Sequence, residues 1–114
     1  RWTFVLVHKP TWTYKDADLE ATGWASIENA LSDRPYTVFA GHKHTYAKFV
    51  RRGRDYYMLA TTGGGSNLSG LAEGKFDEVV WVTMKDDGTV VANLLLNGIQ
   101  GKNVRTLPDP RDGK

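Results

Sequence analysis

Two kinds of hydrophobic pattern follow one another along this chain. Residues 3–7 and 36–40 are short runs of apolar and β-branched side chains, a pattern typical of strands buried on both faces of a sheet. Between these runs, Trp24, Ile27 and Leu31 recur at the spacing of one face of a helix. The first part of the chain therefore predicts a β-α-β unit, and we expect its two strands to be parallel.

The second part predicts antiparallel hairpins. Residues 45–50 and 56–61 flank a short polar segment, and residues 79–84 and 89–96 flank another that ends in an Asp-Gly pair. Such a pair between strand-like runs favours a tight hairpin turn. The predicted fold class is therefore α/β, with one β-α-β unit followed by antiparallel hairpins.

Composition limits the function classes. A chain of 114 residues with 40% hydrophobic side chains is one globular domain or part of one, and without cysteine it has no disulfide or thiolate ligand. The net charge of +2 does not indicate nucleic acid binding, and the apolar runs are far shorter than the roughly 20 residues that span a bilayer. We expect a domain region at residues 1–98 and, because Lys, Arg, Asp, Gly and Pro dominate the remainder, a flexible tail at 99–114.

All three histidines follow the two predicted parallel strands. His8 ends the first strand and is followed by Pro10, whereas His42 and His44 lie in a Gly-His-Lys-His segment after the second. The carboxyl ends of parallel strands meet at one edge of a sheet, so the three imidazoles are expected to lie together there. Neutral imidazole is a common metal ligand, so the sequence predicts a metal site, with Gly41 permitting a sharp turn before His42.

An apolar strand ending in His-x-Pro, then a helix, then a strand running into Gly-His-x-His resembles the last two metal-binding motifs of the calcineurin-like metallophosphoesterase superfamily. The resemblance covers about residues 2–96. Tyr46 and the Thr-Gly-Gly-Gly sequence at 62–65 are also similar to its serine/threonine phosphatase and purple acid phosphatase branches.

The resemblance implies half of an α/β/β/α sandwich and an enzyme that hydrolyses phosphoesters by a metal-bridged hydroxide. The cofactors would be two divalent or trivalent ions of Mn, Fe or Zn. His8 and His42 are implied as ligands of one ion, His44 as a ligand of the other, and Tyr46 as a substrate contact. Trp12 and Tyr14 are lesser candidates for the same pocket, since aromatic side chains on such segments more often lie in a core.

The earlier motifs of that superfamily, Asp-x-His, Gly-Asp-x-x-Asp and Gly-Asn-His, which supply its carboxylate and asparagine ligands, do not occur in these 114 residues. We therefore expect the chain to be the carboxyl-terminal half of such a domain and to be inactive alone, with no catalytic residue assigned to it. Its expected partners are the missing amino-terminal half and a phosphoester substrate. The sheet edge left open by that half favours self-association.

Two other functions stay open: a non-catalytic binding or scaffold domain of the same fold, and an unrelated β-rich module with a mononuclear histidine site. Smaller features have plainer interpretations. The Arg-rich segment 51–54 is expected to be a solvated hairpin tip, and the Gly-rich segment 61–67 a loop that shapes the metal site. A solvated first helical turn is expected for the acidic residues Asp16, Asp18 and Glu20.

Overall fold

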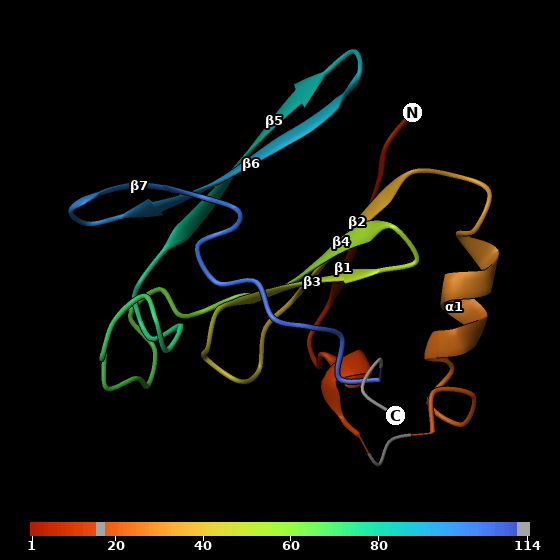
Figure 1. Ribbon diagram of the computed structural model, residues 1–114, viewed down its shortest axis with the longest axis horizontal. Coiled ribbons are helices and arrows are strands. Elements are labelled where there is room, and N and C mark those ends of the chain that lie inside the picture. The colour runs from red at the N-terminus through yellow and green to blue at the C-terminus, as the bar shows by residue number, and fades with distance from the viewer. Residues whose placement is uncertain (16–17, 112–114) are drawn as a thin grey trace.

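The computed structural model describes residues 1–15 and 18–111 and shows a mixed α/β fold with two sheets (Figure 1). The first sheet has four strands in the order β1-β2-β4-β3, and the second has three in the order β5-β6-β7. The elements are β1 (Thr3–Val7), η1 (Thr11–Thr13), α1 (Trp24–Ala30), β2 (Tyr36–Ala40), β3 (Ala47–Arg51), β4 (Arg54–Met58), β5 (Val79–Lys85), β6 (Gly88–Leu95) and β7 (Gly98–Gly101).

The predicted β-α-β unit is confirmed. Strands β1 and β2 are parallel neighbours, with Val7 opposite Ala40, and α1 lies between them in the chain. The helical period identified α1 but only part of its buried face. Trp24 and Glu28, four residues apart, are buried, whereas Ile27 is 40% exposed.

The acidic segment before α1 is not its first turn, contrary to expectation. The helix begins at Trp24 after Gly23, whose φ of 83° is one that glycine adopts at low cost. Asp18 lies upstream in a turn, where its Oδ1 accepts a hydrogen bond from the backbone N–H of Glu20 at 2.9 Å. Asp16 lies outside the described residues.

Both predicted hairpins are confirmed. Strands β3 and β4 are antiparallel, and β4 also pairs in parallel with β2. Strands β5 and β6 are antiparallel, with Lys85 opposite Gly88, so Asp86 and Asp87 form the turn and Gly88 begins β6. Strand β7, which the sequence pattern did not predict, adds to β6.

The first sheet is the middle layer of the molecule, with α1 and η1 on one face and the second sheet on the other (Figure 1). Tyr36, Val38 and Ala40 of β2 belong to the core on the helix side, while Phe39 belongs to the core between the sheets. This alternation is the two-residue period of a strand buried on both faces. Full burial of one large apolar side chain contributes about 1.5–3 kcal/mol.

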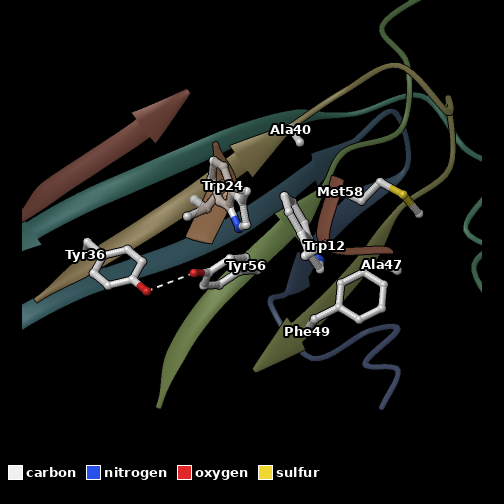
Figure 2. Packing of buried hydrophobic residues seen from close by; sticks show 9 residues of the cluster. Trp12, Trp24, Tyr36, Ala40, Ala47, Phe49, Tyr56 and Met58 are labelled. Atoms are coloured by element: carbon white, nitrogen blue, oxygen red, sulfur yellow. Dashed lines mark hydrogen bonds between the residues drawn. The ribbon is translucent and has the colours of Figure 1, made fainter. Parts of the chain in front are cut away.

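Aromatic rings fill the core on the helix side (Figure 2). The Trp12 ring lies 5.9 Å from that of Trp24 and 5.0 Å from that of Tyr56, measured between centroids. Trp12 is fully buried, so its expected place beside a substrate pocket is wrong for this structure, and it stabilises the core instead.

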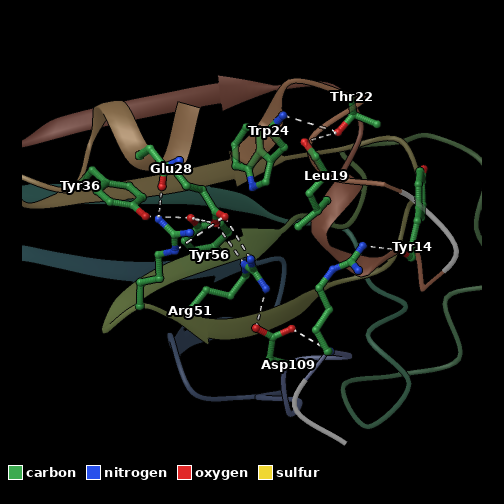
Figure 3. A network of polar contacts seen from close by, with 12 residues as sticks. Tyr14, Leu19, Thr22, Trp24, Glu28, Tyr36, Arg51, Tyr56 and Asp109 are labelled. Carbon is green, nitrogen blue, oxygen red and sulfur yellow. Dashed lines mark hydrogen bonds and ion pairs between the residues drawn. The ribbon is translucent and has the colours of Figure 1, made fainter. Parts of the chain in front are cut away.

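A buried ionic network borders this core (Figure 3). The guanidinium of Arg51 lies 3.0 Å from Glu28 and 2.6 Å from Asp109, and the Tyr56 hydroxyl donates a hydrogen bond to Glu28. Burial alone would raise the pKa of Glu28, but the hydrogen bonds from Arg51 and Tyr56 outweigh it and hold that pKa below its usual value. The expected solvated arginine tip therefore needs correction at Arg51, which ties α1, β3 and residue 109 together.

Residues 98–111 contact the rest of the molecule along much of their length. Beyond β7, the backbone of Lys48 donates to the carbonyl of Arg105 at 2.8 Å and accepts from the N–H of Leu107 at 2.9 Å. Leu107 lies against the helix-side core, and Asp109 is bound by Arg51. The domain boundary expected at residue 98 therefore falls inside β7. The tail expected from residue 99 is in contact with the rest of the molecule as far as Asp109. Residues 112–114 lie outside the described part.

Both sheets end on the same flank of the molecule. β1 is the outer strand of the first sheet and β5 that of the second. A groove of about 390 Å³ opens between them, and Leu6 is 77% exposed beside it. The groove is lined by apolar side chains only, namely Phe4, Leu6, Phe39, Leu59, Val80 and Val82. Among the described residues, no helix has the length and apolar character needed to cross a bilayer.

Candidate metal site

The parallel pairing of β1 and β2 brings His8 and His42 into contact, as the sequence predicted. The backbone N–H of Gly41 donates to the carbonyl of His8 at 3.0 Å, which continues the pairing one step beyond the strands. Nδ1 of His42 then lies 3.0 Å from Nε2 of His8, with the ring planes at 77° to each other.

Two nitrogens in this arrangement are either joined by a hydrogen bond, one as donor and one as acceptor, or both donate their lone pairs to one cation. Ligand nitrogens at about 2.0–2.1 Å from a tetrahedral zinc ion are roughly 3.3 Å apart, close to the observed separation. Desolvation, followed by the nearby charges of His8, Lys9, His44 and Lys43, lowers the pKa of His42. A lowered pKa favours the neutral imidazole, which is the form that binds a metal.

His44 makes a different contact. Its Nδ1 lies 2.8 Å from the carbonyl oxygen of Gly65. A carbonyl oxygen only accepts, so Nδ1 carries the proton in this hydrogen bond, and in the neutral ring Nε2 keeps its lone pair. An outer hydrogen bond of this kind is the usual way in which a ligating histidine is oriented. The Gly-rich loop therefore lies beside one of the three histidines, as expected.

The turn after β2 is strained at the histidines and not at the glycine. His42 has φ 75° and His44 has φ 54°, in the left-handed region that costs a side-chain-bearing residue about 1–2 kcal/mol. A Cβ added to Gly41 would meet only the His8 carbonyl, at 4.0 Å. Gly41 was expected to permit a sharp turn before His42, but neither its φ nor the space for a Cβ requires glycine at this position.

The described residues contain no cluster of three or more His, Cys, Asp or Glu side chains that could hold a metal ion. The donor set thus fits one weakly held cation at the His8–His42 pair and does not by itself fit two. Three neutral imidazoles leave the charge of two divalent ions uncompensated.

Tyr46, expected at the substrate, is a core residue in this structure. Its side chain is fully buried and its hydroxyl donates to the carbonyl of Lys102 at 2.8 Å. Burial raises the pKa of Tyr46 to about 12. Its ring lies 5.6 Å from that of Phe76, between the two sheets. The expected role of Tyr46 as a substrate contact stays a prediction, and this structure gives its side chain no exposed surface.

Tyr14 is the aromatic candidate that lies beside the histidine turn. The Lys43 ammonium sits 4.6 Å from the centre of the Tyr14 ring and donates to Oγ1 of Thr13 at 3.1 Å. A cation over an aromatic face is attracted by the ring quadrupole. These contacts attach the segment after β1 to the turn after β2.

Two residues near the turn were not singled out from the sequence. Asp77 and Glu78 hydrogen-bond to residues 60–63, immediately before the glycines that contact His44. They belong to no recognisable local motif, because their partners lie 14 to 18 residues earlier in the chain.

Comparison with known proteins finds no family model, no curated protein and no solved structure that matches this chain. The resemblance to metallophosphoesterases therefore stays a prediction, made from the two histidine motifs and their order in the chain.

Proposed function

We propose that this chain is the carboxyl-terminal part of a metallophosphoesterase domain and supplies the nitrogen ligands of a two-metal centre that hydrolyses phosphoesters. The observation that carries the proposal is the 3.0 Å approach of His42 Nδ1 to His8 Nε2 at the ends of two parallel strands. These two nitrogens approach each other from strand ends 34 residues apart, and the backbone of His42 is held at φ 75°. Packing alone explains this arrangement poorly.

The open flank supports the same proposal. A strand whose two faces are apolar normally has neighbours on both edges, yet β1 is the outer strand of its sheet. β5 is outermost in the second sheet on the same side, and the apolar groove lies between them. One further segment that extends both sheets would cover this groove, which is what the missing half of an α/β/β/α sandwich would do.

Each histidine has a separate role in this proposal. His8 and His42 would bind one cation through Nε2 and Nδ1, and His44 would bind the other through Nε2 while the Gly65 carbonyl orients its ring. A pair of such cations supplies Lewis acidity, activates water and neutralises charge on the phosphoryl oxygens. The carboxylate ligands that balance the charge would come from the other half of the domain.

The first test is the sequence encoded immediately before Arg1, examined for Asp-x-His, Gly-Asp-x-x-Asp and Gly-Asn-His. The biochemical test uses the full-length protein, with metal content measured by mass spectrometry and hydrolysis measured with p-nitrophenyl phosphate. We expect His42→Ala to lose about one metal equivalent and more than 100-fold in kcat/KM, beyond the roughly 10–100-fold loss typical of an outer-shell partner. Lys85→Ala, an exposed change on the β5–β6 hairpin, is the control and should keep both.

Unchanged metal content and activity in His42→Ala would contradict the proposal. Metal binding without hydrolysis in the wild-type protein would instead support a non-catalytic relative of the same fold. If the 114 residues alone bind one ion tightly, the result would support a mononuclear histidine module.

A further inference from the structure

The Gly-rich loop is fastened to the segment that precedes β5. The Asp77 carboxylate accepts hydrogen bonds through Oδ1 from the Thr61 hydroxyl at 2.7 Å and from the Gly63 N–H at 2.9 Å. The Thr62 hydroxyl donates to the Glu78 carbonyl at 2.6 Å, and the Glu78 N–H donates to the Thr61 carbonyl at 2.9 Å. The backbone of Thr61 and Gly63 and the side chains of Thr61 and Thr62 are therefore all hydrogen-bonded to residues 77 and 78.

The next residues of the loop contact His44 directly. A Cβ at Gly64 would lie 3.2 Å from Cγ2 of Thr61 and 3.7 Å from Cε1 of His44, and a Cβ at Gly65 would lie 3.7 Å from Nδ1 of His44. The loop thus packs closely on Thr61 on one side and on the imidazole on the other. Because Gly65 is two residues after Gly63, a shift of Gly63 is expected to move the carbonyl that accepts the hydrogen bond from His44.

We infer that Asp77 is a positioning residue for His44. Its carboxylate fixes residues 61–63, and through them the Gly65 carbonyl, so that His44 keeps its proton on Nδ1 and presents Nε2. The inference rests on the proposed function only in identifying Nε2 as the nitrogen that binds a cation. Charge-assisted hydrogen bonds such as those to Asp77 are stronger than neutral ones, which suits an anchor on an exposed loop.

The test compares Asp77→Ala with Asp77→Asn in the metal-free full-length protein. Histidine labelled with ¹⁵N reports the tautomer of His44 above the titration range of imidazole, and His44→Gln assigns its signals. We expect Asp77→Ala to lower the fraction with the proton on Nδ1 at least about twofold and to speed amide exchange of Gly63 about tenfold. Asp77→Asn, which keeps Oδ1 as a neutral acceptor, should show a smaller change than Asp77→Ala, and Asp86→Ala in the β5–β6 turn should behave like the wild type.

An unchanged His44 tautomer in Asp77→Ala would overturn the inference, and so would an equal loss in Asp77→Asn. If Asp77→Ala does not fold, Thr61→Val removes only the hydroxyl that donates to Asp77 and is expected to shift the tautomer in the same direction.

A Zn²⁺ titration of the same variants separates this inference from the proposed function. We expect the affinity of Asp77→Ala to fall about 10–100-fold, as for other outer-shell partners. A tautomer shift with unchanged Zn²⁺ affinity would contradict the ligand role of His44 in the proposed function while supporting the positioning role of Asp77.

Discussion

Single residues in this protein owe their roles to partners that are distant in the chain. Glu28 is a charged residue of α1, yet it is buried because Arg51, 23 residues later in the chain, supplies a bidentate partner. Tyr46 is buried for a similar reason, since Asn93 and Lys102 satisfy its hydroxyl. Local pattern contains neither partner, so sequence reasoning had no means of placing these side chains.

The histidines are the opposite case, because strand order alone brings His8 and His42 together. Their convergence follows from two apolar runs, a helix between them and the parallel pairing that this connection favours. What could not be foreseen is the hydrogen bond of His44 to Gly65, which depends on a loop 21 residues away.

Glu78 gives a residue-scale prediction about pH. Its side chain is buried, and Oε2 accepts from the Ala60 N–H, whereas Oε1 has no hydrogen-bond partner among residues 1–15 and 18–111. Desolvation therefore raises the pKa of Glu78 to about 7. The pKa of Glu78 is therefore higher in the folded state than in the unfolded state. The protonated form contributes fully to stability below the unfolded pKa, and this contribution is lost as the pH rises through about 7.

We therefore expect Glu78→Gln to unfold at a higher urea concentration than the wild type at pH 8. Its free energy of unfolding should be larger by an amount on the order of 1–3 kcal/mol. At pH 4 the difference should nearly vanish, because both side chains are then neutral and both accept from Ala60. An equal difference at the two pH values would show that ionisation of Glu78 is not the cause.

At the scale of elements, the apolar runs and the helical spacing predicted β1 to β6 and α1, and the turn residues located the hairpins. Strand β7 escaped prediction because a four-residue segment with two glycines has almost no strand pattern of its own. It pairs with β6 only because the antiparallel hairpin already presents a free edge.

Gly74 packs closely against the backbone of Tyr46, the residue immediately before β3. Its φ is 72°, and a Cβ there would lie 2.3 Å from the carbonyl oxygen of Tyr46. Gly53 in the β3–β4 turn has nearly the same φ, 71°, but open space around it.

Gly53→Ala should therefore cost about 1 kcal/mol of stability from the backbone alone. Gly74→Ala should cost about 2 kcal/mol more, because the backbone of Tyr46 must also move. Urea unfolding of the two variants measures the difference, and equal losses would mean that the loop yields without disturbing Tyr46.

For the whole molecule, the hydrophobic pattern indicated a mixed α/β chain, but not that both sheets would end on one flank. The exposed groove between β1 and β5 arises from the tertiary arrangement, because it depends on which strands are outermost in the two sheets. An open edge beside an apolar groove is a template for association with another strand.

We expect the isolated 114-residue chain to self-associate in light scattering as its concentration rises. Leu6→Lys places a charge at the groove and should shift the chain toward monomer, whereas Leu96→Lys, at a side chain exposed in the β6–β7 turn, should not. A wild-type chain that stays monomeric at every concentration would contradict the expectation.

The left-handed backbone at His42 and His44 places thermal stability and ligand chemistry in opposition. Glycine or asparagine tolerates these dihedral angles better than histidine does, so either substitution relieves strain while it removes an imidazole. Stabilising changes at functional positions commonly carry this kind of cost. A library of variants sorted only by melting temperature would accordingly enrich chains that fold more stably and lack the imidazoles that the proposed cation site needs.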